Sequence, residues 1–370
     1  MPTRARSHPG RRWPARLASL VALAITLTGC ATGPSEAGNT VTVVVGYQSK
    51  TINTVTAGTL LRSLGYFEQR LHTLGARTGK NYQVRWEDYS SGAPITAQML
   101  AGKIDIGSMG DYPLLINGSR AARTVRDRTS MISVTGYNLL GALNMVVVRP
   151  DSPITDLAGL RGNSVSTSIG SAAHGTLVQA LRAAGLDPRS ALTIQNQDPP
   201  VGASALTAGT VTGLAQFVAW PGLLVFQNTA KLIYDGSALK VPTLHGVVAR
   251  NSFRAAQPDI VDAFLAAQID ATHYLWQHPL AAANSVAAAT GLPAEVVYLY
   301  NGANGMVSFD PTLKPVLRDA LRADTGFLAS IGNIGPLDVP GFIDDTALRR
   351  VYGPSYDADL ASTQNHSAIT

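Results

Sequence analysis

The sequence predicts an α/β protein with two lobes, each built on a mainly parallel sheet flanked by helices. Two observations support this fold class. After residue 40, short β-branched runs alternate with helical segments, as in βαβ units. The same alternation begins again near residue 143, and the chain then becomes helical towards its end. With 370 residues, 45% of them hydrophobic, the chain is long enough to bury two such cores.

The first lobe is predicted to begin with residues 41–142. Residues 41–46 (VTVVVG) have the β-branched composition of a buried strand and end in glycine. Residues 57–69 follow with apolar side chains at helical spacing. The other predicted elements continue the alternation: strands at 82–86, 104–107 and 130–137, and helices at 95–100 and 113–121.

The second lobe is predicted over residues 143–246. Residues 143–148 (LNMVVV) form its first strand, and 172–184 form a helix that ends at Gly185 with Pro188 close behind. Further elements are expected at 154–160, 164–168, 192–195, 203–208, 213–218 and 232–235.

A strand at 245–249 is predicted to return to the first lobe, which residues 247–355 complete. Helices are expected there at 258–276, 281–290, 293–299 and 311–328. The polar residues 356–370 are expected to form a loose tail.

The first thirty residues have the pattern of an export signal. Five arginines and no acid stand in residues 1–16, and residues 17–27 are an apolar run too short to span a bilayer comfortably. Leu27-Thr28-Gly29 then precede Cys30, the only cysteine in the chain, in a pattern that resembles the bacterial lipobox. We expect a signal peptide over 1–29, lipidation of Cys30, a flexible tether over 30–40 and anchoring on the extracytoplasmic face of the cell membrane. The alternative is a lone buried cysteine.

The charge distribution argues against a nucleic-acid partner. The net charge of +5 comes wholly from the arginines of the signal segment, so the remaining chain has no net charge and no basic surface is expected. Because no second cysteine is present, the exported protein is expected to have no internal disulfide. No apolar run after Cys30 is long enough for a membrane span.

The chain carries no recognisable catalytic or metal motif. Its seven histidines include no pair at the i, i+4 spacing of a helical metal site, and no nucleophile elbow or phosphate-binding glycine loop is present. Asp105 and Asp111 are six residues apart and could act as an acid–base pair, but such carboxylates more often lie on a solvated surface. We expect no metal, no cofactor and no enzymatic activity.

Residues 168–174 (SIGSAAH) are the most specific candidate for a binding site, because a strand passes there into a long helix. The first turn of a helix offers unpaired N–H groups and the positive end of the helix dipole, Gly170 lets a ligand approach the backbone, and Ser171 adds a hydroxyl. An oxyanion requires such donors. The same residues also fit a plain turn glycine and N-cap serine, and His174 is either a cleft donor or a packing residue.

Other strand-end loops are expected to face the same cleft, since ligands of α/β sheets bind beyond the carboxyl ends of the strands. They supply amide and hydroxyl donors and an aromatic wall. With the helix start above, the candidate ligand-binding residues are Gln48, Ser49, Gly110, Asp111, Tyr137, Asn138, Gly170, Ser171, His174 and Trp220.

In an ordered set of short motifs, the sequence resembles the solute-binding proteins of ABC importers, in the nitrate, taurine and aliphatic sulfonate group. The motifs are VGYQ at 45–48, AGKIDIG at 101–107 with GD at 110–111, VRPDSPI at 148–154, GSxxH at 170–174, AGLD at 184–187 and residues 209–221. The resemblance implies a type II periplasmic-binding fold, closure of two lobes around a ligand, delivery to a membrane permease and a monomeric protein. By position it also implies the ligand contacts at Gln48, Gly110, Asp111, the Tyr137 loop, Gly170, Ser171, His174 and Trp220.

The sequence departs from that group beside Trp220. The group often has an aspartate after this tryptophan, where the present chain has Pro221. A carboxylate there would suit a ligand amine, so its loss counts against taurine. We expect a small anionic or polar organic solute, with a sulfonate as first guess and a nitrate-type ligand as a second. The alternatives are a pyrimidine or thiamine-precursor binding protein or a related enzyme on the same fold, or a sensory or adhesive module without a permease.

Overall fold

The computed structural model describes residues 36–123 and 128–362. The chain divides into two compact units, Met1–Ala31 and Thr32–Thr370, and the first unit lies outside the described residues. The predicted signal peptide, Cys30 and half of the predicted tether therefore fall on residues of which nothing is described. The fold and the site below belong to the second unit.

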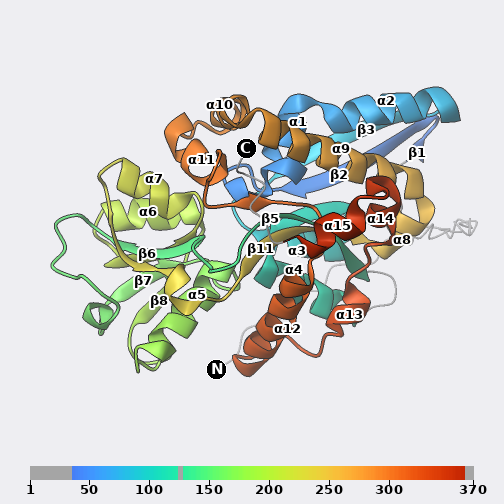
Figure 1. The fold of residues 1–370 in the computed structure, drawn as a ribbon. Coiled ribbons are helices and arrows are strands. Elements are labelled where there is room, and N and C mark those ends of the chain that lie inside the picture. The colour runs from blue at the N-terminus through green and yellow to red at the C-terminus, as the bar shows by residue number, and fades with distance from the viewer. Residues whose placement is uncertain (1–35, 124–127, 363–370) are drawn as a thin grey trace, which may run out of the picture. The chain divides into compact units, whose positions relative to one another are not determined.

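A seven-stranded sheet, called here the large sheet, combines strands from early and late parts of the chain (Figure 1). Its order is β1-β2-β4-β11-β5-β12, and β3 pairs with β2. The strands are β1 (Glu36–Ala37), β2 (Thr40–Tyr47), β3 (Asn81–Asp88), β4 (Ile106–Gly110), β5 (Thr129–Asn138), β11 (Thr243–Arg250) and β12 (Ser308–Phe309). The predicted return of the chain to its first sheet at 245–249 is thus present as β11.

Helices cover both faces of the large sheet because its strands alternate their side chains. On β2, Val43 and Val45 enter one core and Val44 enters the other. The first core is closed by α2 (Tyr66–Thr78), α9 (Pro258–Gln277) and α14 (Thr346–Tyr352), and the second by α3 (Gly92–Leu100), α4 (Asp111–Ala121) and α12 (Pro315–Ser330). A third core joins α1 (Thr59–Leu64), α10 (Pro279–Thr290) and α11 (Ala294–Asn301) to the 3₁₀ helix at Ile52–Ala57.

The small sheet has five strands in the order β10-β6-β9-β7-β8. These are β6 (Asn144–Val148), β7 (Ser164–Thr167), β8 (Thr193–Asn196), β9 (Gly213–Phe217) and β10 (Lys231–Asp235). One face packs against α5 (Ala172–Ala183) and the other against α6 (Pro199–Thr207) and α7 (Trp220–Phe226), as Figure 1 shows in green and yellow. The strands of each sheet with their helices are called the large-sheet half and the small-sheet half below.

The predicted α/β fold is present, and both sheets are mixed although most strands of each run in one direction. In the large sheet β11 runs antiparallel to both neighbours, and in the small sheet β6 does the same. The chain enters a new sheet at each of these two strands, from β5 into β6 and from β10 into β11. At both points the chain comes in at the end of the sheet where the carboxyl ends of the other central strands lie. The entering strand must therefore run against them.

Glycine and loop geometry shorten some predicted helices. The helix predicted at 57–69 is divided, because Gly65 adopts the left-handed conformation (φ 66°) between α1 and α2. The helix predicted at 154–160 is reduced to a 3₁₀ turn at Ala158–Leu160. The last long helix begins at Pro315 rather than at residue 311.

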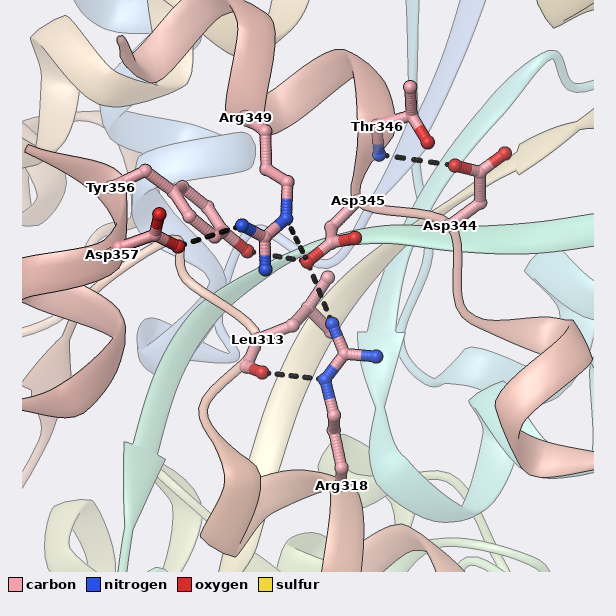
Figure 2. A network of polar contacts seen from close by, with 8 residues as sticks. All are labelled: Leu313, Arg318, Asp344, Asp345, Thr346, Arg349, Tyr356 and Asp357. Atoms are coloured by element: carbon pink, nitrogen blue, oxygen red, sulfur yellow. Dashed lines mark hydrogen bonds and ion pairs between the residues drawn. The ribbon is translucent and has the colours of Figure 1, made fainter. Parts of the chain in front are cut away.

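The sequence predicts a loose tail over residues 356–370. In the structure, the start of this segment is held by a network of polar contacts around Asp345 (Figure 2). The carboxylate of Asp345 accepts hydrogen bonds from Arg318 (2.7 Å), Arg349 (3.2 Å) and the Tyr356 hydroxyl (2.8 Å). Arg349 also pairs with Asp357 at 2.8 Å. Residues from 356 accordingly form a helix, α15 (Tyr356–Ala361), whose tyrosine is buried; residues 363–370 lie outside the described residues.

Candidate functional site

A small pocket of about 130 Å³ lies where the two halves meet. The small-sheet half contributes the end of β7 and the start of α5, and the large-sheet half contributes the start of α3 and one side of α4. Its lining residues are Ser91, Gly92, Ala93, Thr96, Pro113, Ile116, Arg120, Ser168, Ile169, Gly170, Ser171 and Asn333. Two of the predicted ligand-binding residues, Gly170 and Ser171, therefore line it.

The start of α5 has the geometry that its sequence predicts. Gly170 adopts φ 86°, a left-handed conformation that favours glycine, and turns the chain from β7 into the helix. Ser171 is the N-cap, and its Oγ accepts a hydrogen bond of 3.2 Å from the backbone N–H of His174. Ser171 is thus both an N-cap and a pocket residue, so the two readings of this motif are compatible.

A second helix N-terminus lines the same pocket. Ser91 occupies the N-cap position of α3, and Gly92 and Ala93 follow it in the first turn. The Ser91 hydroxyl does not cap its own helix but donates to Asp198 at 3.2 Å. The first turns of α3 and α5 bring N–H groups to the pocket and Arg120 brings a guanidinium, while the Asp198 carboxylate lies against Ser91. Such a combination suits a small oxyanion.

The two halves are held together by polar contacts, one group of which includes the pocket residue Ser91. Asp198, which precedes α6, accepts hydrogen bonds from the hydroxyls of Ser90 (2.8 Å) and Ser91 (3.2 Å). Lys50, after β2, places its Nζ 5.9 Å from the centre of the Trp220 ring, and its carbonyl accepts from the Ala219 N–H at 3.4 Å. The halves therefore contact each other directly through these residues.

The predicted site residues after β2 do not line the pocket. Gln48 is buried, where its Nε2 donates to the Ser108 carbonyl at 3.3 Å. Ser49 donates to Asp88 from both its backbone N–H (2.8 Å) and its hydroxyl (2.6 Å). These contacts stay within the large-sheet half, where they tie the ends of β2, β3 and β4 to one another.

Gly110 and Asp111 stand at the junction of β4, α4 and β11. A side chain at Gly110 would meet the ring of His245, so the glycine permits this close strand pairing. Asp111 is 1% exposed and accepts hydrogen bonds from the Thr243 hydroxyl (2.9 Å) and the Leu244 N–H (3.0 Å). Burial raises the pKa of Asp111 to about 6 although these donors oppose the shift.

Asp105 and Asp111 do not form an acid–base pair, and neither lies on a solvated surface. Asp105 is buried in an ion pair with Arg250 and accepts the N–H of Val44 at 2.9 Å. Both carboxylates join strands of the large sheet. Among residues 36–123 and 128–362, no group of three or more His, Cys, Asp or Glu side chains is arranged to hold a metal, and no helix is long and apolar enough to cross a membrane.

Three more of the candidates do not line the pocket. Tyr137 is buried beside Ser308, and burial raises the pKa of its hydroxyl. Asn138 shapes its loop by donating to the Met306 carbonyl at 2.8 Å and accepting from the Leu140 N–H at 2.9 Å. Trp220 is the first residue of α7, under Lys50.

His174 is 8% exposed and faces a neighbouring pocket along α5. Burial lowers the pKa of its imidazole, so the ring is neutral near pH 7. Its Nδ1 accepts the N–H of Gly170 at 3.4 Å, which leaves Nε2 to carry the proton. The histidine therefore supports the Gly170 turn and offers a donor on its other side.

Ser91, Gly92 and Arg120 are pocket residues that the sequence reasoning missed. The run Ser90-Ser91-Gly92 before a helix carries the same signal as Gly170-Ser171, a small polar residue at a helix start beside glycine. That signal was available in the sequence. Arg120, in the last turn of α4, carries no local sign that it reaches the pocket.

Comparison with known proteins agrees with this architecture. The family model described as NMT1/THI5 like matches residues 126–282. The taurine-binding periplasmic protein of Escherichia coli K12 is 25% identical over 230 residues, which are 61% of this chain and 68% of that protein. The chain is thus similar in sequence to proteins named for taurine and aliphatic sulfonate binding. The resemblance stated from the sequence motifs is thereby confirmed.

Solved structures show the same fold as this chain. The alkanesulfonate-binding protein SsuA from Xanthomonas axonopodis, bound to MOPS, matches with a TM-score of 0.67 and 19% identity, over 82% of this chain and 98% of that one. The desulfurization enzyme DSZB matches with a TM-score of 0.59 and 16% identity, over 84% of this chain and 99% of the enzyme. The chain has the periplasmic-binding-protein fold, which binding proteins and at least one enzyme share.

Proposed function

We propose that this protein is the extracytoplasmic solute-binding component of an ABC importer, and that it captures a small organic anion of the sulfonate type. The observation that carries the proposal is the pocket lined by the N-termini of α3 and α5 and by Arg120. Three positive groups converge there on a volume suited to an oxyanion head. The relatives named for taurine and alkanesulfonates support the same ligand class.

Closure of the two halves around the solute would produce the form that a permease recognises. Ligand donors come from both halves, the first-turn N–H groups of α3 from one and the start of α5 with Ser171 from the other, so they act together only when the halves are closed. A bound solute therefore biases an open–closed equilibrium towards the closed form. We place the boundaries of the halves at residues 41–142 with 247–355, and at 143–246. The membership of the strands in the two sheets supports this division except at β11, which joins the large sheet from Thr243.

We propose a binding role rather than catalysis for this chain. A structural neighbour is a cysteine-to-serine mutant of DSZB in complex with biphenyl-2-sulfinic acid, with a TM-score of 0.61 and 17% identity. The present chain has a single cysteine, Cys30, at the end of its export signal. We propose that this cysteine carries a lipid that holds the protein, as a monomer, at the membrane.

A thermal-shift screen of residues 31–370 tests the proposed function. The solutes are alkanesulfonates, taurine, nitrate, bicarbonate, pyrimidines and amino acids. A sulfonate at a hundred times its Kd should add about 2.7 kcal/mol to the free energy of unfolding and raise Tm by several degrees. A rise with a pyrimidine or an amino acid and none with any oxyanion would exclude the proposed ligand class.

A further inference from the structure

Asp324 interrupts the apolar face of α12. Leu317, Leu321 and Leu328 are buried at helical spacing, and Asp324 lies between them on the same face of the helix. Its side chain is as inaccessible as theirs, with 2% exposure. An apolar residue would fit this pattern, so the buried carboxyl at this position indicates a role other than packing.

The carboxyl of Asp324 has few hydrogen-bond partners for its burial. It is hydrogen-bonded to the Tyr112 hydroxyl of α4, and its Oδ2 has no partner among the described residues. A buried carboxylate with so few donors is costly, and Asp111 places a like charge nearby. Burial, and then Asp111, raise the pKa of Asp324 well above its ordinary value. While it stays buried, Asp324 therefore favours its neutral, protonated form.

Helix α5 of the small-sheet half covers the Tyr112 hydroxyl. The Gln179 Nε2 donates a hydrogen bond of 2.9 Å to this hydroxyl. A side chain at Gly175 would overlap the Tyr112 ring at its hydroxyl end, so the backbone of α5 lies directly against that end. The hydroxyl thus stands between the two halves, with Gln179 on one side and Asp324 on the other.

A second contact joins α5 to α12 beside Asp324. The Arg182 guanidinium of α5 lies 5.6 Å from the centre of the Phe327 ring, and Phe327 follows Asp324 by three residues on α12. The Phe327 ring in turn lies 6.0 Å from the Tyr112 ring. Because α5 covers α12 from Asp324 to Phe327, separation of the halves would admit water to the Asp324 carboxyl. We call these residues the Tyr112 cluster: Tyr112, Gln179, Arg182, Asp324 and Phe327.

The other titratable groups around Asp324 do not depend on α5 in this way. Asp111 accepts its hydrogen bonds within the large-sheet half, so they persist when α5 moves. His245 of β11, beside Gly110, and His174 of α5 are neutral near pH 7, because burial lowers the pKa of each. Helix α13 (Val339–Phe342), which also packs against α12, has no titratable residue.

We propose that closure of the two halves takes up a proton at Asp324, so that the Tyr112 cluster acts as a pH-sensitive latch on solute capture. This inference rests on the closure that the proposed function requires. When α5 moves away, water hydrates the Asp324 carboxylate and its proton passes to solvent; when α5 returns, the carboxylate binds a proton from solvent and becomes neutral. Because the closed form binds more protons than the open form, closure and solute affinity should weaken as pH rises.

The distance between the halves in the solute-free protein tests this proposal. Residues 31–370 contain no cysteine, so Ala183→Cys on α5 and Ala329→Cys on α12, both exposed positions, accept spin labels selectively. The interspin distance, measured by electron paramagnetic resonance from about pH 4.5 to about pH 9, should be shortest in acid and lengthen as pH rises. A distance that stays constant over this whole range would overturn the proposal.

Asp324→Asn in the labelled protein identifies the group that takes up the proton. The amide has the shape of the neutral carboxyl and cannot ionise, so this variant should keep the short distance at every pH. The matched control is Asp319→Asn, which removes an exposed carboxylate from the same helix and should leave the pH response unchanged. If Asp324→Asn retains the pH response of the labelled parent, another group takes up the proton and the proposal is wrong.

Proton uptake on solute binding gives a second measurement, which also decides the question if Asp324→Asn does not fold. Ethanesulfonate stays ionised over this pH range, so it contributes no proton itself. Calorimetry in two buffers of different ionisation enthalpy should show uptake of up to about one proton, with Kd rising up to about tenfold per pH unit. No uptake at any pH in this range would overturn the proposal. Failure of every sulfonate to bind contradicts the proposed function alone, because the interspin distance requires no solute.

Discussion

The side-chain amide of Gln179 donates a hydrogen bond of 2.9 Å to the hydroxyl of Tyr112. Gln179 lies on α5 and Tyr112 on α4, so this bond joins the two halves beside the pocket. The Tyr112 ring also lies against Gly175, and a side chain at residue 175 would overlap the ring. The Tyr112 hydroxyl is hydrogen-bonded to Asp324 of α12 as well. The contact brings α5 and its Ser171 cap against the large-sheet half. We therefore regard it as part of the closed form.

Removing the Tyr112 hydroxyl should weaken ligand binding by destabilising closure. Tyr112→Phe leaves Gln179 and Asp324 without this partner, which costs about 1–1.5 kcal/mol and should raise Kd roughly tenfold. Calorimetry gives the Kd, and small-angle scattering gives the compaction on ligand addition. Tyr298→Phe on α11, a half-buried tyrosine remote from α5, is the control. Unchanged Kd and compaction in Tyr112→Phe would show that the contact does not contribute to closure.

Buried Asp111 should make the protein less stable as pH rises from about 4 to 6. Its pKa in the folded protein is raised from 3.8 to about 6 by burial, so the folded state holds a proton that the unfolded state has lost. The free energy of unfolding should fall by up to about 3 kcal/mol across this window. Asp111→Asn should reduce the fall but not remove it, because burial also raises the pKa of its neighbour Asp324, whereas the exposed control Asp319→Asn should keep the whole fall. Urea unfolding at several pH values measures this, and parallel profiles for all three proteins would contradict the assignment.

Buried His245 should act in the opposite direction. Burial lowers the pKa of its imidazole from 6.5 to about 3, so the unfolded state binds a proton that the folded state excludes. Stability should therefore be lost as pH falls from about 6.5 towards 3, by an amount on the order of 4–5 kcal/mol. His245→Gln should flatten this acid limb, and the exposed His72→Gln should not. An acid limb that survives in His245→Gln would assign it to other groups.

Ser171 should contribute to both stability and binding. Ser171→Ala removes the side-chain acceptor for the His174 N–H, which should cost about 1 kcal/mol of stability. The same change removes a donor from the pocket and should raise Kd about fivefold to tenfold. Ser171→Thr keeps the hydroxyl and should restore most of both quantities. Wild-type affinity in Ser171→Ala would exclude this hydroxyl from the ligand site.

Local patterns sufficed for the parts of the fold in which neighbours along the chain meet. The β-branched run at residues 41–46 identified β2, and the start of α5 at Ser171 followed from the small residues around Gly170. The antiparallel direction of β6 and β11 was not predicted. The direction of a strand depends on the end of the sheet at which the chain comes in. No short window of sequence contains that information.

The same limit explains the candidate residues that lie outside the pocket. Gln48 and Asp111 follow strands and are polar, which suits a ligand contact, but their partners Ser108, Thr243 and Leu244 lie about 60 and 130 residues away. Only the assembled sheet brings those partners to them. The sequence predicted a cleft beyond the carboxyl ends of the strands. Side-chain packing decides which of the residues there face the pocket.

Cys30→Ser should release the protein from the membrane if its thiol carries the proposed lipid. Serine keeps the size and polarity of the position but has no sulfur to form the thioether. With the rest of residues 1–29 unchanged, the variant should appear in the medium or the periplasm, whereas wild type should fractionate with membranes and release only with detergent. Thr32→Ser is the matched control, and mass spectrometry of the N-terminal peptide detects the lipid directly. A Cys30→Ser protein that remains with the membrane fraction would refute lipidation as the means of anchoring.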